Sequence, residues 1–172
     1  MRGAWAAAVL LLAGCAPHEG NAPAGYPGTL AAKRRVWAAI QPLAASRGID
    51  PGFVYAVVRI ESNFNAHERR GEACGLMQIK PSAWKDLSRV PFGVGVWNWR
   101  MNLEVGIESL ASIKGVLARK GVFSYPLLWA SYHYGLDYVE ARGFDTSRIP
   151  RPSDPISYRL FKGEIHPLAP PN

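Results

Sequence analysis

Residues 61–65, Glu-Ser-Asn-Phe-Asn, and residues 75–79, Gly-Leu-Met-Gln-Ile, form the stretch on which the interpretation of this chain depends. Glu61 stands where an apolar segment, residues 53–60, comes to its end. That segment is apolar on nearly every side, which predicts a buried helix. A carboxyl group at the end of a buried helix is partly removed from water, and this favours the protonated form that a general acid needs. The alternative is a glutamate that simply emerges into solvent at a helix end.

The start of this helix is marked by local signals. Asp50 suits the N-cap position and Pro51 the first helical position. Ile49 and Val54 have the spacing of a hydrophobic staple, in which the residue before the cap packs on the first turns. A helix is therefore expected to begin directly after Asp50.

Three blocks in this order resemble the Slt-type lytic transglycosylases, bacterial enzymes that cleave peptidoglycan and have a fold like that of goose lysozyme. The first is Glu-Ser-x-Phe-Asn followed by Gly-Leu-Met-Gln-Ile-x-Pro, at residues 61–81. The second is Asn-Leu-x-x-Gly-x-x-x-Leu at residues 102–110, and the third is Ser-Tyr-His-Tyr-Gly at residues 131–135. The resemblance covers about residues 44–140, with a weaker similarity to about 160. It implies a mainly α, lysozyme-like fold with at most a very small β element.

The resemblance also implies the chemistry. Most glycosidases use two carboxyl groups, whereas in this family one glutamate serves as acid and then as base. Glu61 would protonate the bond between N-acetylmuramic acid and N-acetylglucosamine and then accept a proton from the C6 hydroxyl of the muramic acid. The product is a 1,6-anhydromuramic acid end. No metal or other cofactor is implied, and the four histidines are too scattered in the sequence to suggest a metal site.

The resemblance also implies roles for other residues of the site, position by position. Tyr132 is expected to orient the catalytic carboxyl group, and Gln78 to hydrogen-bond substrate amides near the cleaved bond. Met77 is expected either to line the sugar site or to pack in the core. Ser62 is expected to support the helix end, with a minor role among the substrate-binding residues. His133 stands where the family has Asn, and it is either a substrate-binding or a structural histidine.

The loop between Glu61 and Gly75 departs further from the family pattern. It is about one residue shorter and lacks the serine that touches substrate, and Arg69 and Arg70 stand near that place. Tyr134 replaces a small residue of the third block. These departures concern the subsites and the preferred glycan rather than the identity of the acid.

Two other functions stay open at this point. A lysozyme that hydrolyses the same bond with water would need a second carboxylate, for which Glu68 and Glu72 are the candidates closest in sequence. A non-catalytic, peptidoglycan-binding scaffold lipoprotein would keep the groove without turnover. The missing serine and His133 favour the scaffold, whereas Glu61 and Gln78 argue against it.

The chain has 172 residues, of which 48% are hydrophobic, and a formal charge of +7. This length and composition indicate one globular domain. A basic chain favours anionic partners, and a polyanionic cell wall fits this charge. Its short basic runs carry no nucleic-acid motif, so peptidoglycan glycan strands are the expected partner. A monomer is expected. Wall turnover, an envelope-spanning assembly and a phage setting all stay open.

The N-terminal region indicates export. Residues 1–14 have the composition of a signal peptide, and residues 12–15, Leu-Ala-Gly-Cys, resemble the bacterial lipobox, with Cys15 as the acylated residue. Ala at position 16 implies the periplasmic face of the outer membrane. Residues 15–28 would form the lipidated Cys and a flexible tether, residues 29–165 the domain, and residues 166–172 a Pro-rich tail. The sequence contexts of Cys15 and Cys74 argue against a disulfide.

The other expected elements follow from periodicity and capping residues. In chain order they are a helix over 29–47 that is kinked or divided at Pro42, with Leu30, Trp37, Ile40 and Ala44 on one face; a short extended piece at 75–79; a helix opening at Pro81; a loop over 90–99; a helix over 102–120; a helix capped by Ser124; and a short helix at 157–162.

Overall fold

Helix α2 (Pro51–Ser62) is the central element of the fold, and ten of its twelve residues are buried. The carboxylate of Asp50 accepts a hydrogen bond from the backbone N–H of Phe53 at 3.1 Å, and Pro51 occupies the first turn. The predicted start of the helix is therefore confirmed. Asn63 ends it in the left-handed conformation, with φ of 51°. The last turn of α2 consequently places Glu61 at the point where the chain leaves the core.

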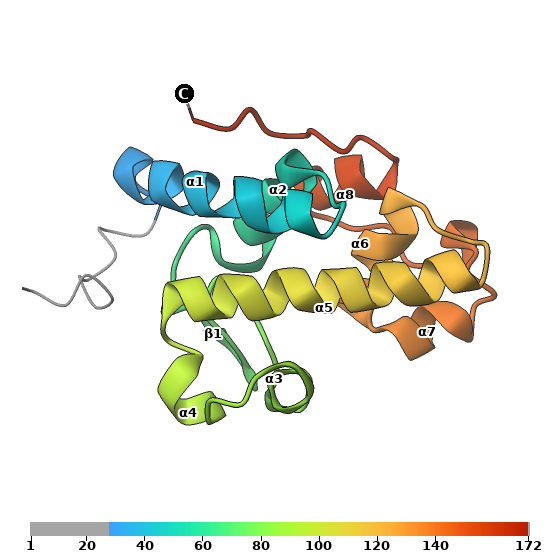
Figure 1. The fold of residues 1–172 in the computed structure, drawn as a ribbon. Coiled ribbons are helices and arrows are strands. Elements are labelled where there is room, and N and C mark those ends of the chain that lie inside the picture. Colours follow the sequence, from blue (N-terminus) through green and yellow to red (C-terminus); the bar gives the residue numbers. More distant parts are fainter. Residues whose placement is uncertain (1–27, 172) are drawn as a thin grey trace, which may run out of the picture.

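The computed structural model describes residues 28–171. Apart from one antiparallel hairpin, the secondary structure of this part is helical (Figure 1). This confirms the expected mainly α fold with a very small β element. In addition to α2, the elements are α1 (Leu30–Ser46), β1 (Arg69–Arg70), β2 (Ala73–Cys74), α3 (Pro81–Leu87), α4 (Phe92–Gly95), α5 (Trp99–Arg119), α6 (Tyr125–Tyr134), α7 (Leu136–Glu140), the 3₁₀ helix η1 (Thr146–Arg148) and α8 (Pro155–Phe161).

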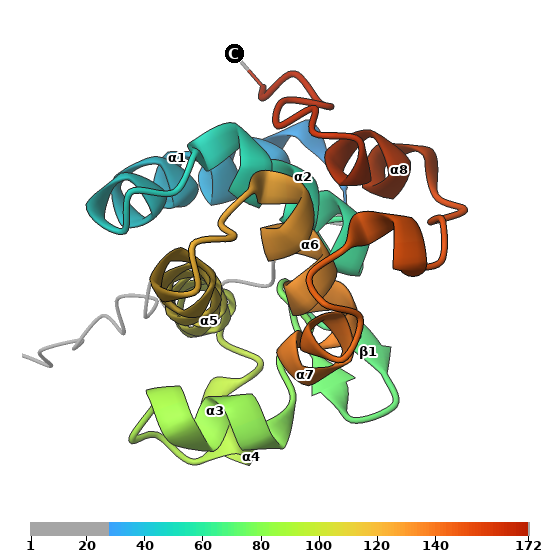
Figure 2. The ribbon, with the colours of Figure 1, turned by 90° about the vertical axis from the view of Figure 1, so that its right-hand side faces the viewer.

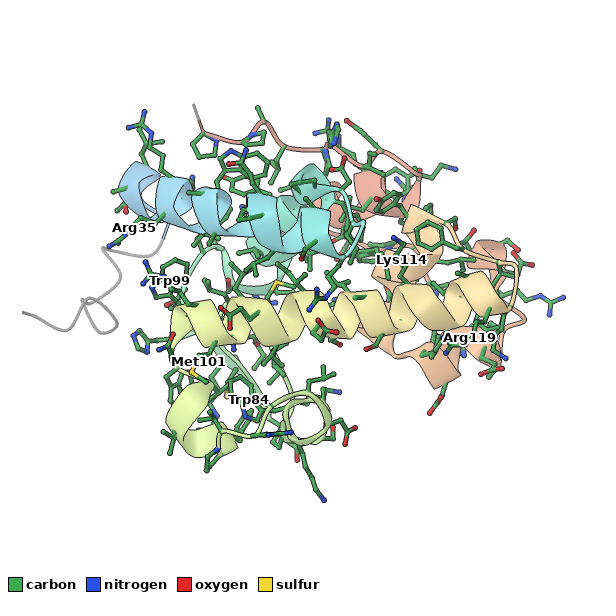
Figure 3. All side chains as sticks on the ribbon, viewed as in Figure 1. Arg35, Trp84, Trp99, Met101, Lys114 and Arg119 are labelled. Carbon is green, nitrogen blue, oxygen red and sulfur yellow. The ribbon has the colours of Figure 1, made fainter. Side chains whose placement is uncertain are left out.

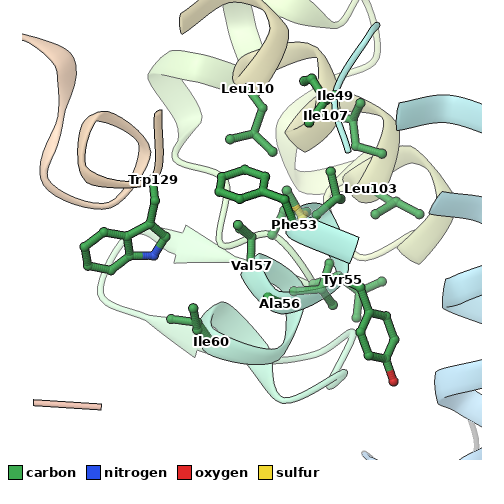
Figure 4. Packing of buried hydrophobic residues seen from close by; sticks show 14 of the residues in the cluster. Ile49, Phe53, Tyr55, Ala56, Val57, Ile60, Leu103, Ile107, Leu110 and Trp129 are labelled. Carbon is green, nitrogen blue, oxygen red and sulfur yellow. The ribbon is translucent and has the colours of Figure 1, made fainter. Parts of the chain in front are cut away.

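The long helices α1 and α5 contact each other and cross at an angle, and both α1 and α8 contact α2 (Figures 1 and 2). The short helices α3 and α4 form a separate layer beneath α5, in which Trp84 is buried (Figure 3). Figure 4 shows the centre of the core, where Phe53 of α2 faces Ile107 and Leu110 of α5. Burying a side chain of this size stabilises a fold by about 1.5–3 kcal/mol.

Helix α1 is continuous through Pro42, so the prediction of two shorter pieces is wrong. Thr29, the first residue of the expected helix, is its N-cap, and the hydroxyl of Thr29 accepts from the backbone N–H of Ala32 at 3.3 Å. Leu30 is 54% exposed and does not share the buried face. That face repeats every four residues instead, and its burial offsets the hydrogen bond that proline removes from the helix. Its members are Ala32, Val36, Ile40 and Ala44.

Residues 75–79 do not form the expected extended piece. The two strands precede them, and residues 75–78 form a turn that returns Ile79 to Cys74 through an isolated bridge. Gly75 and Gln78 have φ of 82° and 49°, values of the left-handed region that a strand does not use. The apolar residues of this block, Leu76, Met77 and Ile79, are thus buried in a turn and at its end rather than in a strand.

The loop expected over residues 90–99 contains helix α4, and α5 begins at Trp99 rather than at Asn102. The earlier start has a local cause. The side chain of Asn98 accepts hydrogen bonds from the backbone N–H groups of Arg100 and Met101, at 3.1 and 3.3 Å. An asparagine in this position is a favourable helix cap.

Three other helices begin close to their predicted positions. Helix α3 begins at Pro81, and α6 is capped by Ser124, which accepts from the backbone N–H of Leu127 at 3.4 Å. Helix α8 begins at Pro155, two residues before the expected start, because Asp154 caps it. The predicted elements after residue 80 are therefore mostly correct in kind and shifted at their ends.

The residues assigned to a Pro-rich tail pack on the domain. Nε2 of His166 lies 2.8 Å from Oδ1 of Asp50, and its ring covers Gly52. The carbonyl of Pro167 accepts from Arg159 at 2.5 Å, and Leu168 packs against the core. Position 165 is consequently not a boundary in the folded chain.

The predicted signal peptide, Cys15 and the tether up to residue 27 lie outside the described residues. Among residues 28–171, no helix is both long and apolar enough to span a bilayer. Cys74 is a buried free thiol. The described part of the chain also holds no group of His, Cys, Asp and Glu residues placed to bind a metal ion.

Candidate active site

Glu61 is buried at the end of α2, with only 7% of its surface exposed, and it lines a cleft of about 320 Å³. We call this the glutamate cleft; its walls come from the β hairpin, the start of α3, the middle of α5 and the end of α6. The expectation that Glu61 lies at the edge of the core is confirmed. A carboxyl group in this position can exchange a proton with a ligand in the cleft while the protein shields it from bulk water.

His133, at the end of α6, contacts this carboxyl group directly. Its Nδ1 lies 3.3 Å from Oε1 of Glu61. The imidazole is stacked on the buried indole of Trp129, with ring centroids 5.1 Å apart and an angle of 13° between the planes. The stack fixes the ring, so the nitrogen that faces Glu61 is held in place. His133 also borders the cleft. Its ring is thus packed, as expected of a structural histidine, and it also lies where a substrate-binding residue would.

The turn at residues 75–78 is held by one buried amide, that of Asn102 on α5. Its Oδ1 accepts from the backbone N–H of Met77 at 2.8 Å, while its Nδ2 donates to the carbonyls of Cys74 at 2.9 Å and Val96 at 3.0 Å. A fully buried side chain whose oxygen and amide group both have partners fixes the segments that it joins. Asn102 belongs to the second block that resembles the family, and no role was predicted for it. These contacts show that it holds the turn.

Tyr132 is connected to the same turn. Its hydroxyl donates to the carbonyl of Met77 at 2.7 Å. Burial raises the pKa of the Tyr132 phenol well above its usual value, and the negative charge of Glu61 raises this pKa further. Tyr132 is thus a neutral donor that ties α6 to the turn beside Glu61. Its hydroxyl bonds to the turn rather than to the carboxyl group that it was expected to orient.

Gln78 lines the cleft, and part of its side chain is used within the protein. Its Nε2 donates to the carbonyls of Gly75 at 2.9 Å and Glu68 at 3.0 Å. Its Oε1 is buried and has no hydrogen-bond partner among the described residues. This carbonyl oxygen is therefore an unused acceptor beneath the surface of the cleft.

The comparisons with known proteins bear on this arrangement. The model of the transglycosylase SLT domain matches residues 38–143, more than half of the chain. The chain belongs to this family. A solved structure with a similar fold is an inactive glutamate-to-glutamine mutant of the lytic transglycosylase Slt from Pseudomonas aeruginosa, with a TM-score of 0.54, 23% identity and 76% of this chain covered. The chain spans about one fifth of that protein (20%), and at this identity the likeness concerns the fold alone. None of the curated proteins compared with the chain matches it.

The side chain of Met77 does not line the glutamate cleft of this SLT domain. It is fully buried, and it packs where Gly106 of α5 leaves room, since a Cβ at Gly106 would lie 2.5 Å from the Met77 side chain. The core alternative for Met77 is therefore correct, and the substrate-binding prediction is wrong. Only the backbone of Met77 takes part in the site, through its contacts with Asn102 and Tyr132.

Ser62 likewise has no contact with the cleft. Its hydroxyl is buried and donates to the carbonyl of Val58 at 3.1 Å, within α2. The expected support of the helix end is confirmed, whereas a substrate-binding role for Ser62 is not compatible with this position. A serine hydroxyl that donates to a carbonyl of its own helix has its hydrogen bond within that helix.

Neither candidate for a second carboxylate reaches the cleft. Glu68 accepts from Asn65 at 3.1 Å and pairs with Arg70 at 3.5 Å, and Glu72 is exposed. Among the described residues that line the glutamate cleft of the SLT domain, Glu61 is the sole acid. The site thus lacks the paired carboxyl groups of a usual glycosidase.

Cationic residues on the walls of the cleft had no assigned role in the sequence. Arg70 and Lys80 both line it. Arg70 had been noted only because it stands near the position of the family serine; Arg69 turns away, with its Nε donating to the carbonyl of Gly71. A run of apolar and polar residues gives no signal for which of two adjacent arginines faces a site, because that depends on the strand register.

Proposed function

We propose that this chain is a lytic transglycosylase that cleaves the β-1,4 bond between N-acetylmuramic acid and N-acetylglucosamine in peptidoglycan, with Glu61 as acid and then as base. The observation that carries the proposal is that Glu61 is the only carboxyl group on the described walls of the cleft and is itself buried. A mechanism with one acid that works twice fits this arrangement, and membership of the SLT family supports the same substrate.

The proposed reaction balances without water. The carboxyl group of Glu61 gives its proton to the glycosidic oxygen, and the bond from that oxygen to C1 of the muramic acid breaks. The C6 oxygen of the same sugar forms the new bond to C1, and its hydroxyl proton passes to the carboxylate of Glu61. The N-acetyl group of the substrate stabilises the positive centre between these steps. The products are a free sugar hydroxyl and a 1,6-anhydromuramic acid end, and Glu61 is again protonated.

The surrounding residues have matching parts in this proposal. His133 would position the carboxyl group and exchange a hydrogen bond with it as the proton leaves and returns. Gln78, which lines the cleft, would contact the acetamido group of a bound sugar. Tyr132 and Asn102 would act through the backbone of the turn, by keeping Gln78 at a fixed distance from Glu61.

Mass spectrometry of the soluble products from peptidoglycan sacculi tests the proposal. The 1,6-anhydro products are lighter by one water than the products of hydrolysis. Reducing ends would support the lysozyme alternative, although neither Glu68 nor Glu72 lines the cleft. A folded protein that releases nothing would support the scaffold alternative.

A lipid anchor on Cys15, at the periplasmic face of the outer membrane, is a separate part of the proposal. It is based on the lipobox at residues 12–15. A single acyl chain binds membranes only marginally, so a stable anchor needs several. Metabolic labelling with a fatty-acid probe should mark the wild type and leave Cys15→Ala unmarked, and equal labelling of both would exclude the anchor.

A further inference from the structure

A second pocket, of about 490 Å³, adjoins the glutamate cleft. The two share the side chains of Arg70, His133 and Tyr134, so they form one continuous depression. The second pocket extends from the end of α2 to the start of α8. Its volume is in the range that accommodates a small ligand or a short peptide branch. A substrate bound at Glu61 can therefore extend a substituent into it.

The second pocket is basic. Three arginines line it, and we call it the arginine pocket after these residues: Arg59, Arg70 and Arg151. The single acid on its described walls is Asp154. That carboxylate is already engaged, because its Oδ1 accepts from the N–H and the hydroxyl of Ser157 at 2.8 and 2.9 Å. Positive charge is thus concentrated here without an internal counterion for each arginine.

The guanidinium groups differ in how they are held. Arg59 makes no side-chain hydrogen bond or ion pair with the described residues. Arg151 lies over the ring of Tyr158, 4.0 Å from its centroid. Arg70 has two long contacts, an ion pair with Glu68 at 3.5 Å and a hydrogen bond to the carbonyl of Ile60 at 3.5 Å. Stacking on an aromatic face orients a guanidinium group and leaves its N–H groups free. These two features, an oriented guanidinium and an unpaired one, suit the binding of a planar anion.

We propose that the arginine pocket binds a carboxylate of the peptide stem that branches from the muramic acid of the bound strand; this inference rests on the proposed function. The stem is attached to the same sugar whose C1 reacts at Glu61. It carries free carboxylates, which arginine binds with two parallel hydrogen bonds. Because the arginine pocket and the glutamate cleft share three side chains, a branch from the reacting sugar reaches the arginines without leaving the surface. An anion that is not joined to the glycan would gain no affinity from the connection between the arginine pocket and the glutamate cleft.

Binding by a non-cleaving variant tests the proposal. In the Glu61→Gln background, Kd is measured by calorimetry for three soluble glycan oligomers: one with peptide stems, one with the stems removed, and one whose stem carboxylates are converted to amides. The same series is measured after the paired change Arg59→Gln with Arg151→Gln. Arg35→Gln is the matched control for loss of charge, because no residue of α1 lines either depression.

The oligomer with stems should bind about tenfold more tightly than the other two, a modest factor because the pocket is open to solvent. The paired arginine variant should lose this preference and retain the affinity for stem-free glycan, whereas Arg35→Gln should keep the preference. A preference that survives the paired variant, or no preference at all, overturns the inference and leaves the proposed function intact. Failure of every oligomer to bind overturns the proposed function as well.

Discussion

Nδ1 of His133 lies 3.3 Å from Oε1 of Glu61, and the same imidazole is stacked on the buried indole of Trp129. The carboxyl group of Glu61 is therefore positioned by the imidazole of His133, and the orientation of this imidazole is set by its packing on Trp129 in the core. His133 stands where the resemblance places an asparagine, which can also hydrogen-bond to a carboxyl group. An asparagine at this position could therefore replace the polar contact but not the stack on Trp129.

Paired substitutions separate these two contributions. His133→Asn should retain most of kcat, because an amide can replace the contact with Glu61. His133→Phe keeps an aromatic ring on Trp129 and removes the nitrogen, so kcat should fall about tenfold with KM little changed, as a lost hydrogen bond to a charged group predicts. Turnover of soluble glycan measures both. A wild-type kcat for His133→Phe would mean that Nδ1 does not act on Glu61.

The variant Glu61→Gln keeps the shape of the side chain and cannot act as an acid. Turnover of sacculi should fall at least ~10²-fold, the lower end of what a positioned acid–base group contributes. Folding by circular dichroism and binding to sacculi should be retained, since Glu61 is at the wall of the cleft rather than within the apolar core. Near wild-type digestion would place the acid elsewhere.

The raised pKa of Tyr132 predicts a loss of stability in alkali. Above the ordinary Tyr value of 10.0, the unfolded chain releases the phenolic proton while the folded chain keeps it, so the free energy of unfolding falls as pH rises. The slope from this one group is at most about 1.4 kcal/mol per pH unit.

Urea unfolding at about pH 8 and about pH 10.5 should show a smaller loss of stability at the higher pH for Tyr132→Phe than for the wild type. At the lower pH, Tyr132→Phe should be less stable by about 1 kcal/mol, because the bond to Met77 is missing. Identical alkaline losses would show that Tyr132 is not the group concerned.

Two glycines on α5 should respond in opposite ways to alanine. In Gly106→Ala the new Cβ would lie 2.5 Å from the Met77 side chain, and overpacking of this kind costs about 1–3 kcal/mol. In Gly115→Ala the nearest atom is Nη1 of Arg119 at 3.4 Å, at the end of a flexible side chain, so the better helix propensity should stabilise by about 0.5–1 kcal/mol. Urea unfolding of both variants measures the difference. Stabilisation of both variants would show that the contact with Met77 is easily relieved.

Sequence reasoning worked best where the partner of a residue is close in the chain. Asp50 and Ser124 were identified as caps because each accepts from a backbone N–H three residues later. The burial of Glu61 followed from its apolar neighbours in the same helix. Each of these features depends on a few consecutive residues, so a single sequence contains the necessary information.

The parts that were missed depend on contacts between distant segments. Gln78 was expected to use its amide on substrate, yet the nitrogen is bound to the carbonyl of Glu68, ten residues away. The hydroxyl of Tyr132 meets a carbonyl 55 residues earlier in the chain. The space for Met77 is provided by an absent Cβ on another helix, at Gly106. No local pattern encodes such partners, because they arise only when α5 and α6 pack on α2.

The three hydrogen bonds of Asn102 have a consequence for protein engineering. In the turn that carries Gln78, the N–H of Met77 and the carbonyl of Cys74 bond to Asn102, which follows them by 25 and 28 residues in the chain. Grafted alone onto another scaffold, the turn would have an unpaired buried N–H at Met77, which is costly, and the carbonyl of Cys74 would keep only its bond from the N–H of Ile79. The smallest transplantable unit is therefore the turn together with the first half of α5, and any redesign of sugar recognition at Gln78 has to retain the amide at position 102.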